Sequence, residues 1–407
     1  MMDYQSCLDA IFGSFLASRP ARLGRHDRDI RDPRPILDIA TRHGLLPPPE
    51  RTVKITGSKG KGTTARLTAS WLGAQEAGPV GLFISPNEID QADRIRLDGQ
   101  PIGHADFVRL YRRFEPDLTD LRNRLGPARY LSPFGTFLLI ALAWFKEREA
   151  RYFVLEAGRG AAFDEVGRLP AHLAVVTSLF TDHADQIGPA LGDIARNKMA
   201  IAEGARRTIL GPGVPDVLRD NGITAPPDAT IVAPPPETGE LPRWVALDLA
   251  IARMAGRTLI DWNGDRERQS DCPIVTGSFG RLSWRGVPLT YDGSIRFQDF
   301  DRDGFEAFVR RHPSTLIVHS WSDQKDSAPF LAWFREKGVA THAVALSNLD
   351  MHTYRSAGDG AAIIDFTDSA ALGALLDGLV DDLRPDGIYA LGIQPFLRLL
   401  KQAAGRL

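Results

Sequence analysis

One short segment constrains the fold of this chain more than any other feature. Residues 52–56 (TVKIT) have the β-branched composition of a buried strand, and residues 57–64 (GSKGKGTT) follow as a glycine-rich turn. Residues 62–78 then have the pattern of a helix. Because glycines permit tight turns and the first amides of a helix attract anions, this order of elements predicts a phosphate-binding loop.

The polar residues of the turn agree with this prediction. The Lys61 ammonium can reach the outer phosphates of a nucleotide, and a hydroxyl of Thr63 or Thr64 can face a magnesium ion. The spacing is one residue shorter than the common GxxxxGKS/T loop, and a glycine-rich turn without a ligand is the alternative. We predict nucleotide contacts from Gly57, Ser58, Lys59, Gly60, Lys61, Gly62, Thr63 and Thr64.

Composition draws attention to the lysines, because only 8 of the 49 basic residues are lysine and the other 41 are arginine. A second cation in the loop, Lys59, either assists phosphate binding or faces solvent, and the sequence leaves both open.

The net charge of −2 argues against a protein that binds nucleic acid by charge, since such proteins usually carry a basic excess.

The rest of the chain predicts an α/β fold with two domains. Further strands are expected at 80–84, 152–156, 173–178, 316–319, 340–346 and 387–392, alternating with helices, as in parallel sheets covered on both faces. The proline- and glycine-rich residues 211–242 are predicted to be a loop. We assign residues 1–286 to a P-loop parallel-sheet ATPase domain with N-terminal helices, and residues 287–407 to a smaller, Rossmann-like α/β domain.

Three features bear on the compartment. Cys7 and Cys272 lie far apart and offer neither disulfide nor metal-ligand spacing, which suggests a reducing environment. The longest apolar run, residues 137–145, is shorter than the roughly 20 residues that span a bilayer. The N-terminus lacks a basic start followed by an apolar core. We expect a cytoplasmic protein without membrane or nucleic-acid partners.

Several motifs, taken in order, resemble those of folylpolyglutamate and dihydrofolate synthases in the Mur ligase superfamily. The glycine-rich loop resembles the TGTNGKGST loop of these enzymes. Further matches are GLFISP at 81–86, RIR at 94–96, EAGRG at 156–160, Asp164, TS at 177–178, DH at 182–183 and Lys198. Weaker matches are GRL at 280–282, DG at 292–293 and KD at 325–326. The resemblance extends over residues 4–407 and is strongest over 52–203.

The resemblance implies an enzyme that joins a carboxylate to an amine with ATP, through an acyl phosphate, and releases ADP and phosphate. It implies a magnesium site at Ser85, Glu156 and His183, together with the Thr63 hydroxyl. Oxygen-rich sets suit Mg²⁺, and Ser85, Glu156 and His183 each come just after or at the end of a predicted strand, where open α/β sheets bind ligands. The alternatives are a capping or surface carboxylate for Glu156 and a structural loop histidine for His183.

Three further residues receive roles from the resemblance. Lys198 stands where these enzymes have a lysine that is often carbamylated, which would make it an oxygen ligand for a second metal ion; an ordinary helix-surface lysine is the alternative. We count Lys61, His183 and Lys198 as catalytic candidates. Arg281 and Asp292 are candidates for contacts to nucleotide phosphate and ribose, with a salt bridge between domains as the alternative.

Other segments depart from the family pattern. Phe134-Gly135 replaces Phe-Glu, residues 159–167 replace LGGRLDATN in part, and residues 292–297 (DGSIRF) lack the histidine and asparagine of DGAHNP. Because the phosphate and metal positions survive, we predict retained phosphate chemistry with changed substrate recognition. Arginines at 159 and 296 can bind carboxylates through a bidentate fork, although surface arginines are the commoner case.

Three hypotheses follow. The first is a carboxylate–amine ligase with small-molecule substrates, a non-folate acid and an amine that is an amino acid. The second is a folylpolyglutamate or dihydrofolate synthase. The third is a nucleotide-binding pseudoenzyme with a regulatory or scaffold role. The joint retention of Lys61, Glu156, His183 and Lys198 favours catalysis, and the altered DGAHNP segment favours the non-folate acid over the folate.

Overall fold

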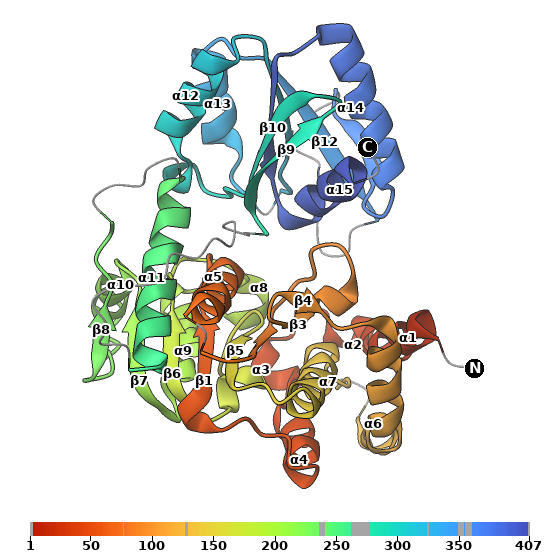
Figure 1. Cartoon of the computed structure of the whole chain (residues 1–407), viewed down its shortest axis with the longest axis vertical. Coiled ribbons are helices and arrows are strands. Elements are labelled where there is room, and N and C mark those ends of the chain that lie inside the picture. The colour runs from red at the N-terminus through yellow and green to blue at the C-terminus, as the bar shows by residue number, and fades with distance from the viewer. Residues whose placement is uncertain are drawn as a thin grey trace. The chain divides into compact units, whose positions relative to one another are not determined.

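The computed structural model describes residues 3–75, 77–126, 129–235, 241–261, 277–323, 325–348, 354 and 360–405. These residues form two compact units (Figure 1). The first comprises Met1–Pro235 and Asp248–Ile274, and the second comprises Pro236–Leu247 and Val275–Leu407. Each unit contains a sheet of mainly parallel strands, which confirms the predicted α/β fold.

The first unit has an eight-stranded sheet in the order β4-β3-β2-β5-β1-β6-β7-β8. The pairs β2-β3 and β3-β4 are antiparallel, and the pairs from β2-β5 to β7-β8 are parallel. The strands are β1 (Thr52–Thr56), β2 (Val80–Phe83), β3 (Ile95–Leu97), β4 (Gln100–Pro101), β5 (Tyr152–Glu156), β6 (Ala171–Val176), β7 (Ala205–Leu210) and β8 (Ala229–Ile231).

The second unit has a six-stranded sheet in the order β13-β12-β11-β14-β10-β9, in which β9 is antiparallel to β10. Its strands are β9 (Phe279–Trp284), β10 (Val287–Asp292), β11 (Thr315–Ser320), β12 (Thr341–Ser347), β13 (Ala362–Asp365) and β14 (Gly387–Gly392). Its helices are α12 (Arg302–Arg311), α13 (Ala328–Glu336), α14 (Ser369–Leu383) and α15 (Gln394–Ala404).

Helices cover the strands of the first sheet, and α5 and α7 both pack against β2. The helices of this unit are α1 (Tyr4–Ala17), α2 (Arg19–Arg22), α3 (Asp27–Ile30), α4 (Arg34–Arg42), α5 (Lys61–Ala74), α6 (His104–Arg124), α7 (Pro133–Glu147), α8 (Ala184–Ile187), α9 (Leu191–Met199) and α10 (Val214–Asp220). Helix α11 (Arg243–Leu259) begins in the second unit and belongs to the first from Asp248 onward. The apolar run at 137–145 lies buried inside α7.

Across the described residues, no helix combines the length and apolar character needed to cross a membrane. Cys7 is buried, and Cys272 lies outside the described residues.

The predicted strands β1, β2, β5 and β6 are confirmed, whereas β7 and β8 were not expected. Strand β7 carries exposed arginines in its first half, so it lacks a continuous apolar run. The predicted loop at 211–242 contains α10 and β8, and in this part the prediction was wrong. Pro215 lies in the first turn of α10, where a proline is tolerated because its missing N–H has no partner in the helix.

The predicted domain boundary at residue 286 falls inside a hairpin of the second sheet. Strands β9 and β10 pair with Trp284 opposite Val287, which leaves a two-residue turn. Arg285 and Gly286 have φ angles of 48° and 84°, and positive values at both positions are typical of a tight hairpin turn. The Arg285-Gly286 turn therefore joins two strands of one unit.

Candidate active site

Four neighbouring strands of the first sheet, β2, β5, β1 and β6, are parallel and end at one edge. Gly57 follows β1, Ser85 lies two residues after β2, Glu156 ends β5, and Thr177 follows β6. The topology therefore brings the predicted phosphate loop and two predicted metal ligands to the same edge, where open α/β sheets bind ligands.

The phosphate loop needs glycine at two positions. Gly57 has a φ of +153°, and a Cβ there would lie 2.0 Å from Thr177 Oγ1. Gly60 has a φ of +85°, and a Cβ there would lie 2.4 Å from Asp248 Oδ1. Helix α5 begins at Lys61, so its first amides follow this turn directly. Asp248 lies on α11 and belongs to no sequence motif, so its position beside Gly60 could not be predicted from the sequence.

Two hydroxyl residues after β6 fix the loop. Ser178 Oγ accepts a hydrogen bond from Lys59 N (2.9 Å), while the Lys59 carbonyl accepts from Thr177 Oγ1 (2.5 Å) and Ser178 Oγ (3.0 Å). Ser58 Oγ donates to the carbonyl of Phe180 (2.8 Å), so this hydroxyl binds the loop to the segment that follows β6. The residues that follow the neighbouring strand β6 thus hold the loop in shape.

Two lysines converge on one carbonyl of the loop. Lys61 Nζ and Lys198 Nζ each donate to the Gly57 carbonyl at 3.0 Å, and Lys198 Nζ also donates to the Arg159 carbonyl at 2.7 Å. Lys198 is fully buried. Burial, and next the positive charge of Lys61, lower the pKa of Lys198 to about 7. Because the hydrogen bond of Lys61 goes to a neutral carbonyl, its positive charge is not neutralised by that partner and can attract an anion.

Glu156 lies beside the first turn of α5. Its Oε2 accepts a hydrogen bond from Ser85 N at 2.9 Å, and a Cβ on Gly62 would lie 3.2 Å from the same oxygen. The side chain is buried, and burial raises the pKa of Glu156 to about 7 although the Lys61 charge acts in the opposite direction. A carboxyl with so perturbed a pKa, next to a cation at a strand end, is typical of functional sites.

His183 precedes the short helix α8 in a left-handed conformation, with a φ of 54°. Its Nε2 lies 3.4 Å from Asp182 Oδ2. The side chain is 37% exposed, yet desolvation by the surrounding chain is the main cause that lowers the pKa of His183, and the charges of Lys61 and Lys198 lower it as well. The imidazole is therefore neutral near pH 7, which is the form that coordinates metals.

The hydroxyls that follow Gly62 suit a hard cation. Thr63 and Thr64 are both buried, and Thr64 Oγ1 has no hydrogen-bond partner among the described residues. In the same part of the chain, no cluster of three or more His, Cys, Asp or Glu side chains forms a ready metal site. An ion here would depend on hydroxyl, carboxylate and phosphate oxygens and on water, as Mg²⁺ commonly does.

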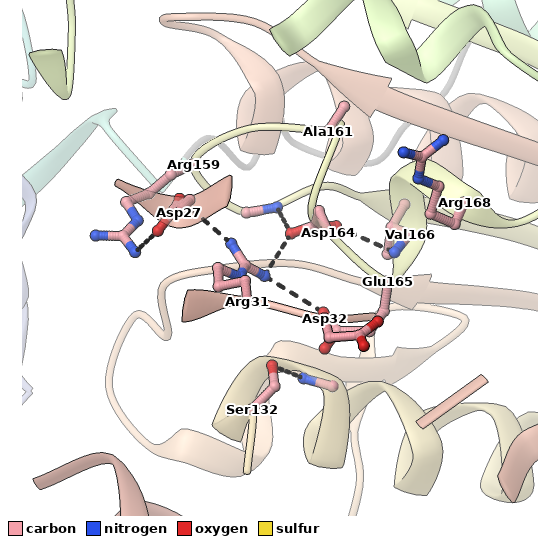
Figure 2. A network of polar contacts seen from close by, with 12 residues as sticks. Asp27, Arg31, Asp32, Ser132, Arg159, Ala161, Asp164, Glu165, Val166 and Arg168 are labelled. Carbon is pink, nitrogen blue, oxygen red and sulfur yellow. Dashed lines mark hydrogen bonds and ion pairs between the residues drawn. The ribbon is translucent and has the colours of Figure 1, made fainter. Parts of the chain in front are cut away.

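A buried ion network lies beside the segment that follows β5 (Figure 2). Arg31 Nη2 is 3.2 Å from Asp164 Oδ2 and 3.4 Å from Glu165 Oε2. Arg159 Nη2 donates to Asp27 Oδ1 at 2.8 Å. The predicted carboxylate fork of Arg159 is therefore engaged within the protein, because an aspartate from the N-terminal segment already pairs with it. Asp27 and Arg31 were not predicted from the sequence, because their partners Arg159 and Asp164 lie more than a hundred residues away.

In the second unit, Arg281 lies on β9 and Asp292 ends β10. Asp292 is fully buried, and its Oδ1 accepts hydrogen bonds from Ser294 N and Ser294 Oγ, both at 2.8 Å. Tyr389 OH lies 3.4 Å from the other carboxylate oxygen. Arg296 Nε is 3.4 Å from Asp299 Oδ2. The contacts of Arg281 and Asp292 to nucleotide stay predictions.

Known proteins are similar to part of this chain in sequence. Over 184 residues the chain is 32% identical to the dihydrofolate synthase/folylpolyglutamate synthase of Escherichia coli (strain K12), which covers 45% of this chain and 41% of that protein. The Mycobacterium tuberculosis protein of the same name is 29% identical over 231 residues, covering 52% and 46%. The chain thus spans less than half the length of the curated relatives it matches. No protein-family model matches it.

Solved structures cover nearly the whole chain. The apo form of L. casei FPGS matches with a TM-score of 0.73 at 18% identity over 100% of both chains. The M. tuberculosis folylpolyglutamate synthase complexed with ADP and AMPPCP matches with a TM-score of 0.71 at 19% identity, over 93% of this chain and 97% of that one. The chain has the fold of the folylpolyglutamate synthases. The resemblance inferred from the motifs is thereby confirmed.

Proposed function

We propose that this chain is an ATP-dependent ligase that joins a carboxylate to an amine and releases ADP and phosphate. The observation that carries the proposal is the edge of the first sheet, where Lys61 and Lys198 share the Gly57 carbonyl beside the buried Glu156. Structural relatives described as complexes with ADP and AMPPCP, and with Mn and AMPPNP, support ATP and a divalent metal ion as ligands.

The proposed reaction has two steps. A carboxylate oxygen attacks the γ-phosphorus of ATP, the bond to the bridging oxygen breaks, and ADP leaves. The amine then attacks the acyl carbon, loses a proton as the C–N bond forms, and displaces phosphate. Negative charge on the transferring phosphoryl group must be held and offset, which is the main demand of such chemistry. Lys61 and the amides at the start of α5 are the groups that we propose for this task.

Thr63, Thr64 and Glu156 are the residues that would hold magnesium, with Ser85 after β2 and His183 before α8 as further candidates. Their donor set fits, because the hydroxyl of Thr64 is buried without a partner among the described residues and Glu156 lies beside the same turn. When bound, the ion would neutralise phosphate charge.

The predicted carbamate on Lys198 has no support in the comparisons. The Lys198 amine donates to two backbone carbonyls, at Gly57 and Arg159, and is fully buried. For the unmodified amine we propose a role in holding the phosphate loop against the segment that follows β5.

For the acid, the names of the relatives favour a folate over our prediction of a non-folate substrate. Related structures are described as an FPGS-AMPPCP-folate complex and as a complex with L-glutamate. We therefore propose dihydropteroate or a reduced folate as the acid and glutamate as the amine. A non-folate acid is the second candidate, and the observation in its favour is the replaced DGAHNP segment, in which Asp292 bonds to Ser294.

The test is ADP release with ATP and Mg²⁺ across acids that include dihydropteroate, a reduced folate and several amino-acid-derived acids, each with glutamate. We expect release that requires both acid and amine and that is lost in Lys61→Ala. Turnover with non-folate acids alone would replace the first candidate by the second. Tight binding of ATP without turnover on any pair would contradict both and support a nucleotide-binding pseudoenzyme.

A further inference from the structure

We propose that Asp27 and Arg31 are positioning residues: they fix residues 157–166 so that the Arg159 carbonyl holds the Lys198 amine at the phosphate loop. The catalytic consequence rests on the proposed function, whereas the positioning itself rests on geometry. Both residues come from the N-terminal segment around α3, which carries none of the motifs that point to nucleotide binding.

The first link closes the segment on itself. Asp164 Oδ2 accepts a hydrogen bond from Gly158 N at 3.1 Å, and its Oδ1 accepts from Val166 N at 3.0 Å. One carboxylate thus ties the start of the segment to its end. Arg31 Nη2 lies 3.2 Å from the oxygen that binds Gly158, so Arg31 holds this closure in place (Figure 2).

The second link runs from the N-terminal segment to the phosphate loop. Arg159 binds on two sides: its guanidinium donates to Asp27 Oδ1 at 2.8 Å, and its carbonyl accepts from Lys198 Nζ at 2.7 Å. Lys198 Nζ in turn donates to the Gly57 carbonyl at 3.0 Å. Three hydrogen bonds therefore connect Asp27 with the carbonyl that also binds Lys61.

A third contact fixes the segment against α9, the helix that carries Lys198. Asn197 Oδ1 accepts a hydrogen bond from Ala161 N at 3.0 Å, and a Cβ on Gly160 would lie 2.1 Å from the same oxygen. The backbone beside Arg159 and the residue before Lys198 are thus held together. Little freedom remains for the Arg159 carbonyl once Asp27 holds its side chain.

Because these side chains are buried, the network fixes the position of residues 157–166 more than it adds to the stability of the fold. The side chains of Arg31, Asp27 and Asp164 are 8%, 3% and 0% exposed. Charges removed from water regain little net free energy from pairing, yet a buried pair that loses one partner leaves an uncompensated charge. The network therefore adds modestly to stability and disfavours arrangements of the segment that would separate these charges.

The test compares Asp27→Asn and Arg31→Lys with the control Arg34→Lys. Arg34 belongs to the same segment, is 80% exposed and pairs with Asp32. We expect kcat for ADP release to fall by about tenfold or more in the two test variants, with a smaller change in KM for ATP, and the control to match wild type. In a Lys198→Met background, Asp27→Asn should add no further loss. Full additivity, or an unchanged kcat in both test variants, would overturn the proposal.

A second readout does not need ligase activity. Acetic anhydride labelling, followed by peptide mass spectrometry, measures how accessible the Lys198 amine is relative to Lys54. Lys54 Nζ is also buried, and it donates to the carbonyls of Gly167, Leu169 and Glu203. We expect Asp27→Asn to raise labelling of Lys198 alone. An equal rise at Lys54 would indicate general loosening and contradict the proposal. A selective rise in a chain without turnover would refute the proposed function and leave the positioning in place.

Discussion

The ends of β1 and β10 invite comparison, because each strand leads into a glycine-containing turn. After β1, two lysines donate to a neutral carbonyl of Gly57 and a carboxyl lies buried nearby. After β10, Asp292 accepts two hydrogen bonds from Ser294 and lies within reach of Tyr389. The first turn has charge to offer a ligand, whereas the second satisfies its own carboxylate. A motif in sequence therefore indicates a site only when its polar groups keep some capacity to bind.

The largest expected effect is on the β1 side. Lys61→Ala removes an ammonium from the phosphate loop, and we expect kcat for ADP release to fall by about 100- to 1000-fold, as for other single groups that stabilise transition-state charge. Steady-state kinetics with saturating ATP provides the measurement. Lys59→Ala is the companion variant that resolves whether the second loop lysine contributes. Wild-type kcat in Lys61→Ala would remove the basis for placing phosphate chemistry at this edge.

Glu156→Gln tests whether the buried carboxyl at the same edge lowers the free energy of unfolding when it is ionised. The folded-state pKa of about 7 lies above the ordinary value of 4.5, so the folded chain holds a proton that the unfolded chain loses as pH rises between these values. The contribution of Glu156 to the free energy of unfolding should therefore fall through this window. We expect the stability of Glu156→Gln relative to wild type to rise by about 3 kcal/mol from pH 4.5 to above pH 7.

Urea unfolding at pH 5 and pH 8 measures this difference. Glu147→Gln is the control, because Arg109 lowers the pKa of the Glu147 carboxyl, so that its contribution changes mainly below pH 5 and should stay nearly constant between pH 5 and pH 8. A pH-independent difference between Glu156→Gln and wild type would show that the buried carboxyl does not titrate in this range.

Gly135→Ala tests the packing around α7 in the same unit, where a glycine leaves no room for a side chain. A Cβ at Gly135 would lie 2.5 Å from Glu165 Oε1 and 3.1 Å from Ile36 Cγ1. We expect Gly135→Ala to lower the free energy of unfolding by about 1–3 kcal/mol, since overpacking forces neighbours to move. Gly13→Ala in α1 is the matched control, because nothing lies within 4 Å of its Cβ position. The cost at Gly135 should shrink in a Glu165→Ala background, and an unchanged cost would place the strain elsewhere.

Asp292→Asn carries the smallest expected effect on activity. Because the carboxylate is buried and bonded within its own unit, we expect a loss of about 1 kcal/mol in stability and little change in KM for ATP. Thermal unfolding and ATP kinetics measure the two quantities. A large rise in KM for ATP would instead support the role that the family resemblance assigns to Asp292, and would break the contrast between the two strand ends.

Features that depend on residues close together in the sequence were predicted, and features that depend on residues far apart in the chain were not. The phosphate loop, its strand and its helix are local, and all three were predicted from residues 52–78. Strand ends that carry Ser85 and Glu156 were predicted because parallel strands share an edge. Asp248, Asp27 and Arg31 were not, since each acts through partners far away in the chain and belongs to no periodic pattern or motif.

The most direct test of the central claim follows oxygen through the reaction. An acid substrate labelled with ¹⁸O in its carboxyl group is incubated with ATP, Mg²⁺, glutamate and the enzyme, and the released phosphate is analysed by mass spectrometry. An acyl phosphate formed at the phosphate loop transfers one carboxyl oxygen, so we predict one ¹⁸O atom in phosphate for each amide formed. Unlabelled phosphate, or AMP in place of ADP, would contradict the proposed ligase.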